Sequence, residues 1–411
     1  MTAPEHGLTR LHAVAMFAAF ALAYFLSALL RAITATLAPV FSLEMGLSAS
    51  GLGLLAGIYF VGFAATQLPL GGALDRFGPK RVLLALLLVA VSGCGLFALA
   101  EQFSHLLFAR LLIGIGVSAC LMAPLTAYRR HLSGTAQLRA NSWMLMMGSL
   151  GMLASTLPVQ WLLPWSGWRG LFWLLSVMVM VVLVPLAWLV PSDQPRGAHG
   201  ASDIGYGRIW RDATFRRLAP MGFCLYGGLI AMQSLWIGPW LTEVAGESAT
   251  GSAAGLLAVN AGMLLAFLVW GAVVLRLTLL GWPPLRLITV GWPLSVATLG
   301  VVVILGPAAG AISWTIWCVA ASVVTLSQPA VGLAFPQAHA GRALSAFNLV
   351  VFLGVFATQW GIGLMIDGLQ SIGWTRLAAY QAAFTAVGAG MAGSGVWYWL
   401  RPKACPYRAP G

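Results

Sequence analysis

The chain has 411 residues, of which 60% are hydrophobic and 8% are charged, and its formal net charge is +12. Soluble domains usually carry about 25% charged residues, so this composition excludes an ordinary water-soluble protein. The positive charge is distributed over short segments between apolar stretches and does not form one basic domain, which argues against a nucleic-acid partner.

Twelve apolar segments follow one another along the chain. They fall at 11–40, 48–72, 82–100, 104–127, 140–163, 169–190, 217–242, 251–275, 286–305, 310–334, 343–366 and 376–400. About 20 apolar residues in a helix span a bilayer, and backbone groups in hydrocarbon must be hydrogen-bonded within the segment. No segment alternates in polarity as the strands of a β-barrel do. The sequence therefore predicts an all-α membrane protein with twelve transmembrane helices.

The basic residues predict the orientation of these helices. All Lys and Arg residues except four fall at the termini or in alternate loops, on one side of the predicted membrane; the exceptions are Arg31, Arg110, Arg169 and Arg376. Basic loops remain on the cytoplasmic side, so both termini are predicted to be cytoplasmic. Lys is rare and Arg is common, which is typical of a GC-rich bacterial genome and predicts a bacterial inner-membrane location.

The chain divides into two halves that echo each other. A polar segment at 191–216 predicts a cytoplasmic linker between a six-helix bundle at 1–190 and a second bundle at 217–411. Transporters often contain such internal repeats. Three pairs of features recur at an offset of about 200 residues: Pro39 and Glu44 with Pro239 and Glu243, Gly53 with Gly255, and Gly151 with Gly354.

The loop after the second segment carries the most specific motif. It reads Gly71-Gly-Ala-Leu-Asp75-Arg76-Phe-Gly78-Pro-Lys80-Arg81, and its glycines permit a tight turn with positive φ. The motif resembles the signature of the major facilitator superfamily, with each fixed position matched. Arg110-Leu-Leu-Ile-Gly-Ile-Gly in the fourth segment and Gly167-Trp-Arg between the fifth and sixth are also similar to that superfamily.

This resemblance implies a fold of two pseudo-symmetric six-helix bundles in a protein that works as a monomer. It implies that the loop motif is a conformational latch that joins the bundles at the cytoplasmic side, with Arg110 able to pair with the motif carboxylate or relay protons. The latch and coupling residues are Gly71, Asp75, Arg76, Gly78, Lys80, Arg81 and Arg110. A purely structural role for Asp75 is the alternative.

The resemblance also implies a substrate site near the membrane midplane between the two bundles. Arg31 is the leading candidate, because an unpaired charge deep in a span costs at least about 2.5–3.5 kcal/mol and must face protein or a wet cavity. The expected substrate-binding residues are Arg31, Tyr24, Ser27, Thr34, Tyr226, Gln233, Trp236, Asn260, Gln328 and Asn348. The alternatives are that Arg31 snorkels outward or pairs with Glu44, and that the amides and Trp236 only join helices.

No Asp or Glu lies deep in a predicted span, which favours an anionic substrate over a cation. The predicted function is a secondary transporter that moves a small organic anion or zwitterion by symport or exchange, with protons as a candidate coupling ion. The alternatives are a proton-coupled exporter of hydrophobic compounds and a membrane sensor that transports nothing. No nucleophile–base arrangement, metal-ligand cluster or nucleotide-binding loop is present, so we predict no enzymatic activity, cofactor or metal.

Overall fold

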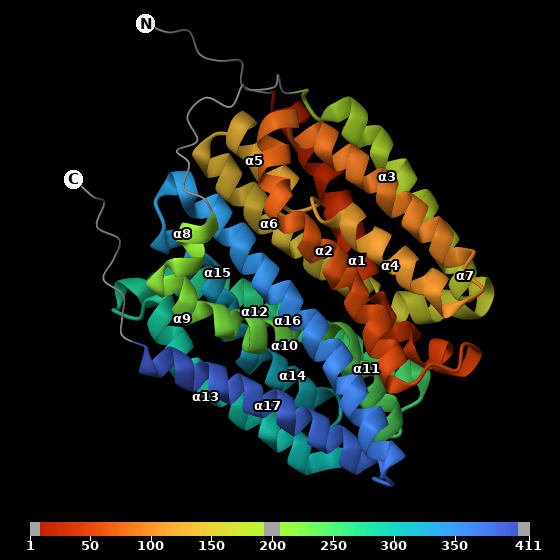
Figure 1. Ribbon diagram of the computed structural model, residues 1–411. Coiled ribbons are helices and arrows are strands. Elements are labelled where there is room, and N and C mark those ends of the chain that lie inside the picture. Colours follow the sequence, from red (N-terminus) through yellow and green to blue (C-terminus); the bar gives the residue numbers. More distant parts are fainter. Residues whose placement is uncertain (1–8, 193–205, 402–411) are drawn as a thin grey trace, which may run out of the picture.

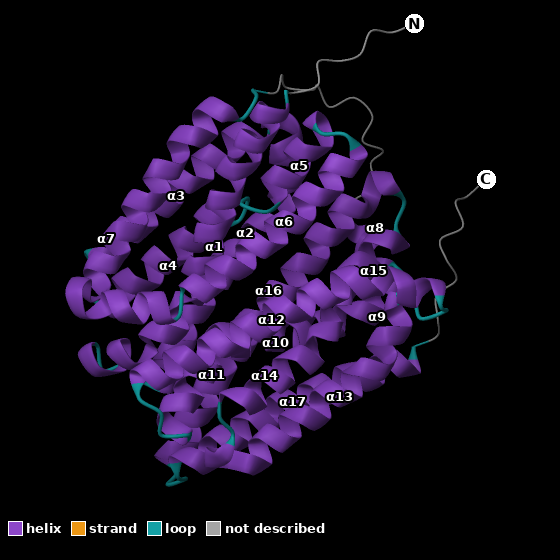
Figure 2. Ribbon diagram, turned by 180° about the vertical axis from the view of Figure 1, so that it is seen from behind, coloured by secondary structure: helices purple, strands orange, loops and turns teal. Residues whose placement is uncertain are grey.

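The computed structural model describes residues 9–192 and 206–401, and this part of the chain is helical with short turns and contains no strand (Figure 2). The first half contains α1 (Arg10–Glu44), α2 (Ala49–Phe77), α3 (Pro79–Ala98), α4 (Phe103–Val117), α5 (Met122–His131), α6 (Gly134–Ala154) and α7 (Leu157–Leu189). α4 and α5 together make the fourth membrane crossing. α7 is interrupted at Gly167, whose φ of 59° suits a residue without a Cβ. The fifth crossing therefore runs through α6 into the first part of α7, and the sixth begins after Gly167.

The second half begins with the short helix α8 (Tyr206–Arg211) and then crosses six more times. The seventh crossing runs from Ala213 to Val244 through α9 (Ala213–Met221), α10 (Gly227–Ala231) and α11 (Ile237–Pro239), with a π-helical turn after each of them. The others are α12 (Ala249–Leu279), α13 (Pro284–Leu305), α14 with α15 (Ala311–Ala321 and Ser327–Ala334), α16 (Gln337–Ser371) and α17 (Arg376–Leu400).

Ten helical segments of the described chain are long and apolar enough to cross a membrane. The remaining crossings are made by α6, which continues into α7, and by the 25-residue helix α17. The prediction of an all-α membrane fold with twelve transmembrane helices is therefore confirmed. The predicted linker at 191–216 lies partly outside the described residues, because 193–205 are not described; α8 and the start of α9 form the rest of it.

The helices form two bundles with separate apolar cores. Figure 1 shows the helices of the first half, coloured red to yellow, gathered apart from those of the second half, coloured green to blue. The first core includes Phe20 and Phe97, and the second includes Trp240 and Trp314. Both cores include large buried aromatic side chains, with Trp240 and Trp314 in an edge-to-face contact of 5.6 Å between ring centroids.

The two ends of the molecule differ in charge. We call the end that carries the start of α1 and the α2–α3, α5–α6 and α12–α13 turns the basic end, and the other the opposite end. At the opposite end, Glu44 accepts a hydrogen bond from Trp168 Nε1 at 2.6 Å and lies 3.9 Å from Arg169 Nη1. Each partner comes from the sixth crossing of the same bundle.

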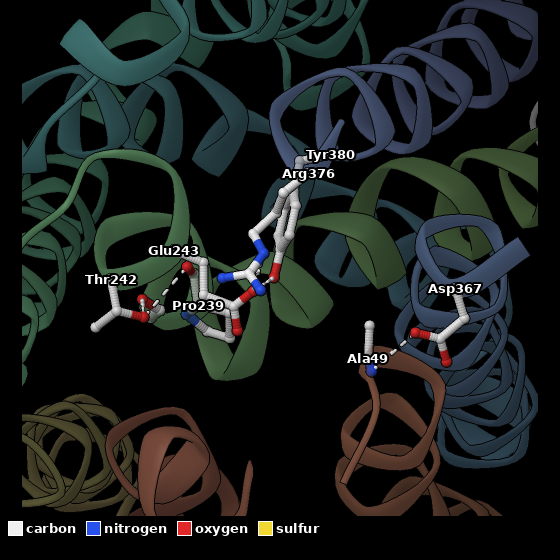
Figure 3. Close-up of polar contacts among 8 residues, drawn as sticks. Ala49, Pro239, Thr242, Glu243, Asp367, Arg376 and Tyr380 are labelled. Carbon is white, nitrogen blue, oxygen red and sulfur yellow. Dashed lines mark hydrogen bonds and ion pairs between the residues drawn. The ribbon is translucent and has the colours of Figure 1, made fainter. Parts of the chain in front are cut away.

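The second bundle repeats this arrangement. Glu243 at the end of the seventh crossing accepts a hydrogen bond from the Tyr380 hydroxyl at 3.2 Å and lies 3.7 Å from Arg376 Nε. Figure 3 shows both α17 side chains converging on this carboxylate. The echo between Glu44 and Glu243 in the sequence thus corresponds to equivalent positions in space.

Antiparallel packing of α2 and α16 makes the main contact between the bundles, and α16 runs along the junction in Figure 1. The rings of Phe63 of α2 and Phe352 of α16 are in contact, with centroids 4.5 Å apart and planes tilted by 55°. α1 packs against the seventh crossing, where Gly238 allows close approach to the Ala35 carbonyl, and α6 packs against α12. The two bundles therefore meet along α2–α16 and, through α1 and α6, toward the opposite end.

Candidate functional site

Arg31 lies at the junction of the two bundles among tyrosine side chains. Tyr24, two turns earlier in α1, lies beside the guanidinium, and Tyr59 of α2 and Tyr226 of the second bundle lie close enough to interact with it electrostatically. Tyr59 is fully buried, whereas Arg31, Tyr24 and Tyr226 are half-buried. The predicted residues Arg31, Tyr24 and Tyr226 are thus brought together, and we call these four residues the arginine–tyrosine cluster.

Two glycines of α6 let α1 take this position. A Cβ at Gly148 would overlap the ring of Tyr24, and a Cβ at Gly151 would overlap the backbone carbonyl of Phe25. α16 uses Gly354 in the same way, against the carbonyl of Phe223 at the start of the seventh crossing. Small residues let helices approach closely in a membrane, where packing drives their association.

Among the residues that the structure describes, no carboxylate pairs with the Arg31 side chain. Its Nε is buried without a hydrogen-bond acceptor, and Glu44, the proposed alternative partner, is bound to Trp168 and Arg169 instead. The alternative that Arg31 pairs with Glu44 is therefore wrong in this structure. Arg binds carboxylates in bidentate geometry, so a guanidinium without an acidic partner is chemically suited to an anion.

The other predicted residues of α1, Ser27 and Thr34, are more deeply enclosed. Ser27 lies beside Tyr59 and Cys120, and Thr34 is buried with no hydrogen-bond partner for its hydroxyl. Cys120 belongs to the turn between α4 and α5, where the helix is interrupted. Interrupted helices are frequent around transporter binding sites.

The predicted amides bond to one another across helices. Gln233 Nε2 donates to Asn260 Oδ1 at 2.9 Å, and Asn260 Nδ2 lies 3.5 Å from the carbonyl of Met152 in α6. Gln328 donates to Asn348 Oδ1, and Asn348 Nδ2 donates to Gln67 Oε1 of α2 at 3.4 Å. Both chains connect the two bundles; whether any of these amides also contacts substrate stays a prediction.

Trp236 is fully buried and donates from Nε1 to the carbonyl oxygen of Gln359 at 3.1 Å. Gln359 in turn donates from Nε2 to Ser234 at 3.0 Å. Sequence reasoning missed Gln359, Gln67 and Tyr59. The first two are single amides in apolar spans, the same signal that selected Asn260, so this signal was sufficient to find them.

Arg110 is a second arginine in the interior of the first bundle and is fully buried. Its Nη1 donates to the Leu30 carbonyl at 2.8 Å, and its guanidinium lies over the rings of Phe97 and Phe172. The expectation that Arg110 pairs with the motif carboxylate is wrong for this conformation. That carboxylate, Asp75, lies at the basic end and pairs with Arg130.

The loop motif forms the turn between α2 and α3. Gly78 has a φ of 82°, so the predicted need for a glycine with positive φ is met here, and no atom lies within 4 Å of a Cβ built at Gly71. Asp75 is 85% exposed and lies 3.8 Å from Arg130 Nη2 of α5. In the same turn, Arg76 stacks on Phe77, Lys80 donates to Ser192, and Arg81 is exposed. In this conformation Asp75 therefore contacts its own bundle.

The fold, the two-bundle junction and the loop motif agree with a sequence comparison. The Major Facilitator Superfamily profile matches residues 20–359, which is most of the chain. The chain therefore belongs to the Major Facilitator Superfamily and is a membrane transporter of that type.

Three relatives are similar over part of the chain. The cis,cis-muconate transport protein of Acinetobacter baylyi is 33% identical over 171 residues, 37% of this chain and 39% of that protein. The gallate transporter of Pseudomonas putida is 29% identical over 166 residues, 39% of this chain and 36% of that protein. The chloramphenicol resistance protein CraA of Acinetobacter baumannii is 30% identical over 154 residues, 37% of each chain. The matches span less than two fifths of the length of these relatives.

A solved structure shares the fold. The crystal structure of a D-xylose–proton symporter superposes with a TM-score of 0.76 and covers 94% of this chain and 97% of its own. The two sequences are 16% identical, so this likeness establishes the arrangement of the helices.

Proposed function

We propose that the protein is a secondary transporter that moves a small organic carboxylate or zwitterion across the bacterial inner membrane by alternating access. The observation that carries the proposal is Arg31, a cation at the bundle junction with tyrosine neighbours and no acidic partner in the described part of the chain. The Asp and Glu residues of the described chain lie at helix ends or in turns, so the interior offers no carboxylate for a cationic substrate. The muconate and gallate transporters are relatives that carry organic anions.

In this proposal Arg31 binds the substrate carboxylate through its guanidinium. Tyr24 and Tyr226 supply hydroxyl donors and ring faces from either bundle, so a bound anion contacts both halves at once. The remaining predicted residues, Ser27, Thr34, Gln233, Trp236, Asn260, Gln328 and Asn348, surround or support this position. Protons are the proposed coupling ion, and the transporter is proposed to work as a monomer with both termini in the cytoplasm.

The test measures binding of muconate and gallate to the purified protein, with benzyl alcohol as an uncharged aromatic control. We expect Arg31→Ala to weaken carboxylate binding about 10–100-fold, because hydrogen bonds to charged groups contribute ~1.5–3 kcal/mol. Arg31→Lys should retain part of the affinity, since it keeps the charge without the fork of donors. Arg286→Ala, at an exposed arginine of α13, is the matched control and should bind normally. Equal affinity of wild type and Arg31→Ala for both carboxylates would contradict the proposal.

Export of hydrophobic compounds is the second candidate, and the similarity to CraA favours it. The two functions differ in cargo and direction. Proteoliposomes with an imposed pH gradient should accumulate gallate or muconate if the first proposal holds. Movement of chloramphenicol without movement of either carboxylate would support the exporter instead.

A further inference from the structure

The first turn of α2 is capped by a carboxylate from the other bundle. Asp367 of α16 accepts hydrogen bonds from the backbone N–H of Ala49 at 3.1 Å and from that of Ser50 at 2.9 Å, one on each carboxylate oxygen. Figure 3 shows Asp367 facing the start of α2. Ser48, the local N-cap residue, bonds the next N–H, that of Gly51.

This contact is electrostatically favourable. The first N–H groups of a helix have no partner within the helix, and the helix dipole places partial positive charge at that end. A carboxylate that accepts two backbone N–H bonds there makes charge-assisted hydrogen bonds, which are stronger than those between neutral groups. Asp367 thus links α16 to α2 more strongly than apolar packing alone.

The backbones of the two helices touch about one and two turns along α16 from this carboxylate. A Cβ at Gly363 would overlap the Ala49 carbonyl, and a Cβ at Gly53 would overlap the Gln359 carbonyl. Asp367 therefore meets the α2 terminus only when the bundles are closed together at the opposite end. Any motion that separates α2 from α16 there must break both hydrogen bonds.

The other end of α2 carries a carboxylate that pairs within its own bundle. Asp75, in the last turn of α2, is 85% exposed and pairs with Arg130 of its own bundle. The start of α2 is therefore bonded to the second bundle, whereas the motif carboxylate at its end contacts the first bundle.

We propose that Asp367 is a positioning residue of the transport cycle, a clasp that holds the opposite end closed and releases α2 when that end opens. The strength of the clasp sets the population that is open at the opposite end. This role rests on the proposed alternating-access function, but it requires no particular substrate.

The test is hydrogen–deuterium exchange on the full-length protein in lipid nanodiscs. Asp367→Asn removes the charge and one of the two acceptors, and we expect amide exchange in residues 49–53 to become about tenfold faster. Exchange in α13, which lies away from this junction, should not change. Asp367→Glu keeps the charge on a longer side chain and should restore most of the protection. Glu247→Gln, at an exposed carboxylate in the α11–α12 turn, is the control and should match wild type.

A transport measurement completes the test. If the clasp acts in the cycle, Asp367→Asn should change the maximal transport rate with little change in substrate affinity at the arginine–tyrosine cluster, and Asp367→Glu should recover it. Unchanged exchange at 49–53 in Asp367→Asn would overturn the clasp, as would equal loss of protection throughout the protein in both variants. Because exchange is measured without substrate, failure of the carboxylate proposal would leave this result intact.

Discussion

Arg110 of α4 donates a hydrogen bond of 2.8 Å to the carbonyl oxygen of Leu30, the residue that precedes Arg31 in α1. The donor is fully buried, and its Nε and Nη2 have no hydrogen-bond partner. The buried guanidinium is held over the rings of Phe97 and Phe172. Arg110 therefore fixes the backbone of α1 beside the proposed substrate-binding arginine, at the cost of burying a charge.

We expect Arg110→Met to weaken substrate binding about tenfold or more, because a hydrogen bond to a charged group contributes ~1.5–3 kcal/mol and here it orients α1. The free energy of unfolding should stay similar or increase, since the desolvation cost of an unpaired buried charge disappears. Affinity for gallate or muconate and the thermal unfolding midpoint, measured in the same detergent, separate the two effects. A lower midpoint with normal affinity would show that Arg110 serves stability alone.

Asp75→Asn should abolish transport and leave stability almost unchanged. The carboxylate is 85% exposed and lies 3.8 Å from Arg130, and exposed ion pairs contribute only about 0–1 kcal/mol. A large effect on uptake must therefore arise in another conformation, where the motif is proposed to act as a latch. Uptake into proteoliposomes and the unfolding midpoint are the measurements. Glu101→Gln, at an exposed carboxylate of the α3–α4 turn, is the control; normal uptake by Asp75→Asn would contradict the latch.

Gly354→Ala should destabilise the protein by about 1–3 kcal/mol, the usual cost of overpacking. The added Cβ would overlap the Phe223 carbonyl, and backbone atoms cannot move aside as a side chain can. Gly361→Ala in the same helix is the matched control, because no atom lies within 4 Å of its Cβ. Alanine there should be neutral or stabilise by about 0.5–1 kcal/mol.

The equivalent substitution in the first bundle, Gly151→Ala, should have a similar cost, since its Cβ would overlap the Phe25 carbonyl. Thermal unfolding of the three variants in lipid nanodiscs provides the comparison. Equal midpoints for Gly354→Ala and Gly361→Ala would refute the close-contact argument.

Much of the architecture was predictable from local sequence. The apolar segments predicted the twelve crossings because length and hydropathy decide whether a helix can span a bilayer. The glycines of the loop motif marked a turn that requires positive φ, and Gly78 has it. Tyr24 and Arg31 are seven residues apart, so helical periodicity places them on the same face of α1, and the two side chains do lie close together.

The partners of polar groups were decided by the tertiary structure. Glu44 bonds to Trp168 rather than to Arg31, and Asp367 caps a helix of the other bundle. Arg110 donates to the Leu30 carbonyl, whereas Asp75 pairs with Arg130. Lipid tails and protein interior are equally apolar, so hydropathy does not indicate which face of a span meets another helix. The sequence thus determined where each helix crosses and turns, whereas helix rotation and the contact between distant segments, set by close packing at glycines, determined which side chains meet.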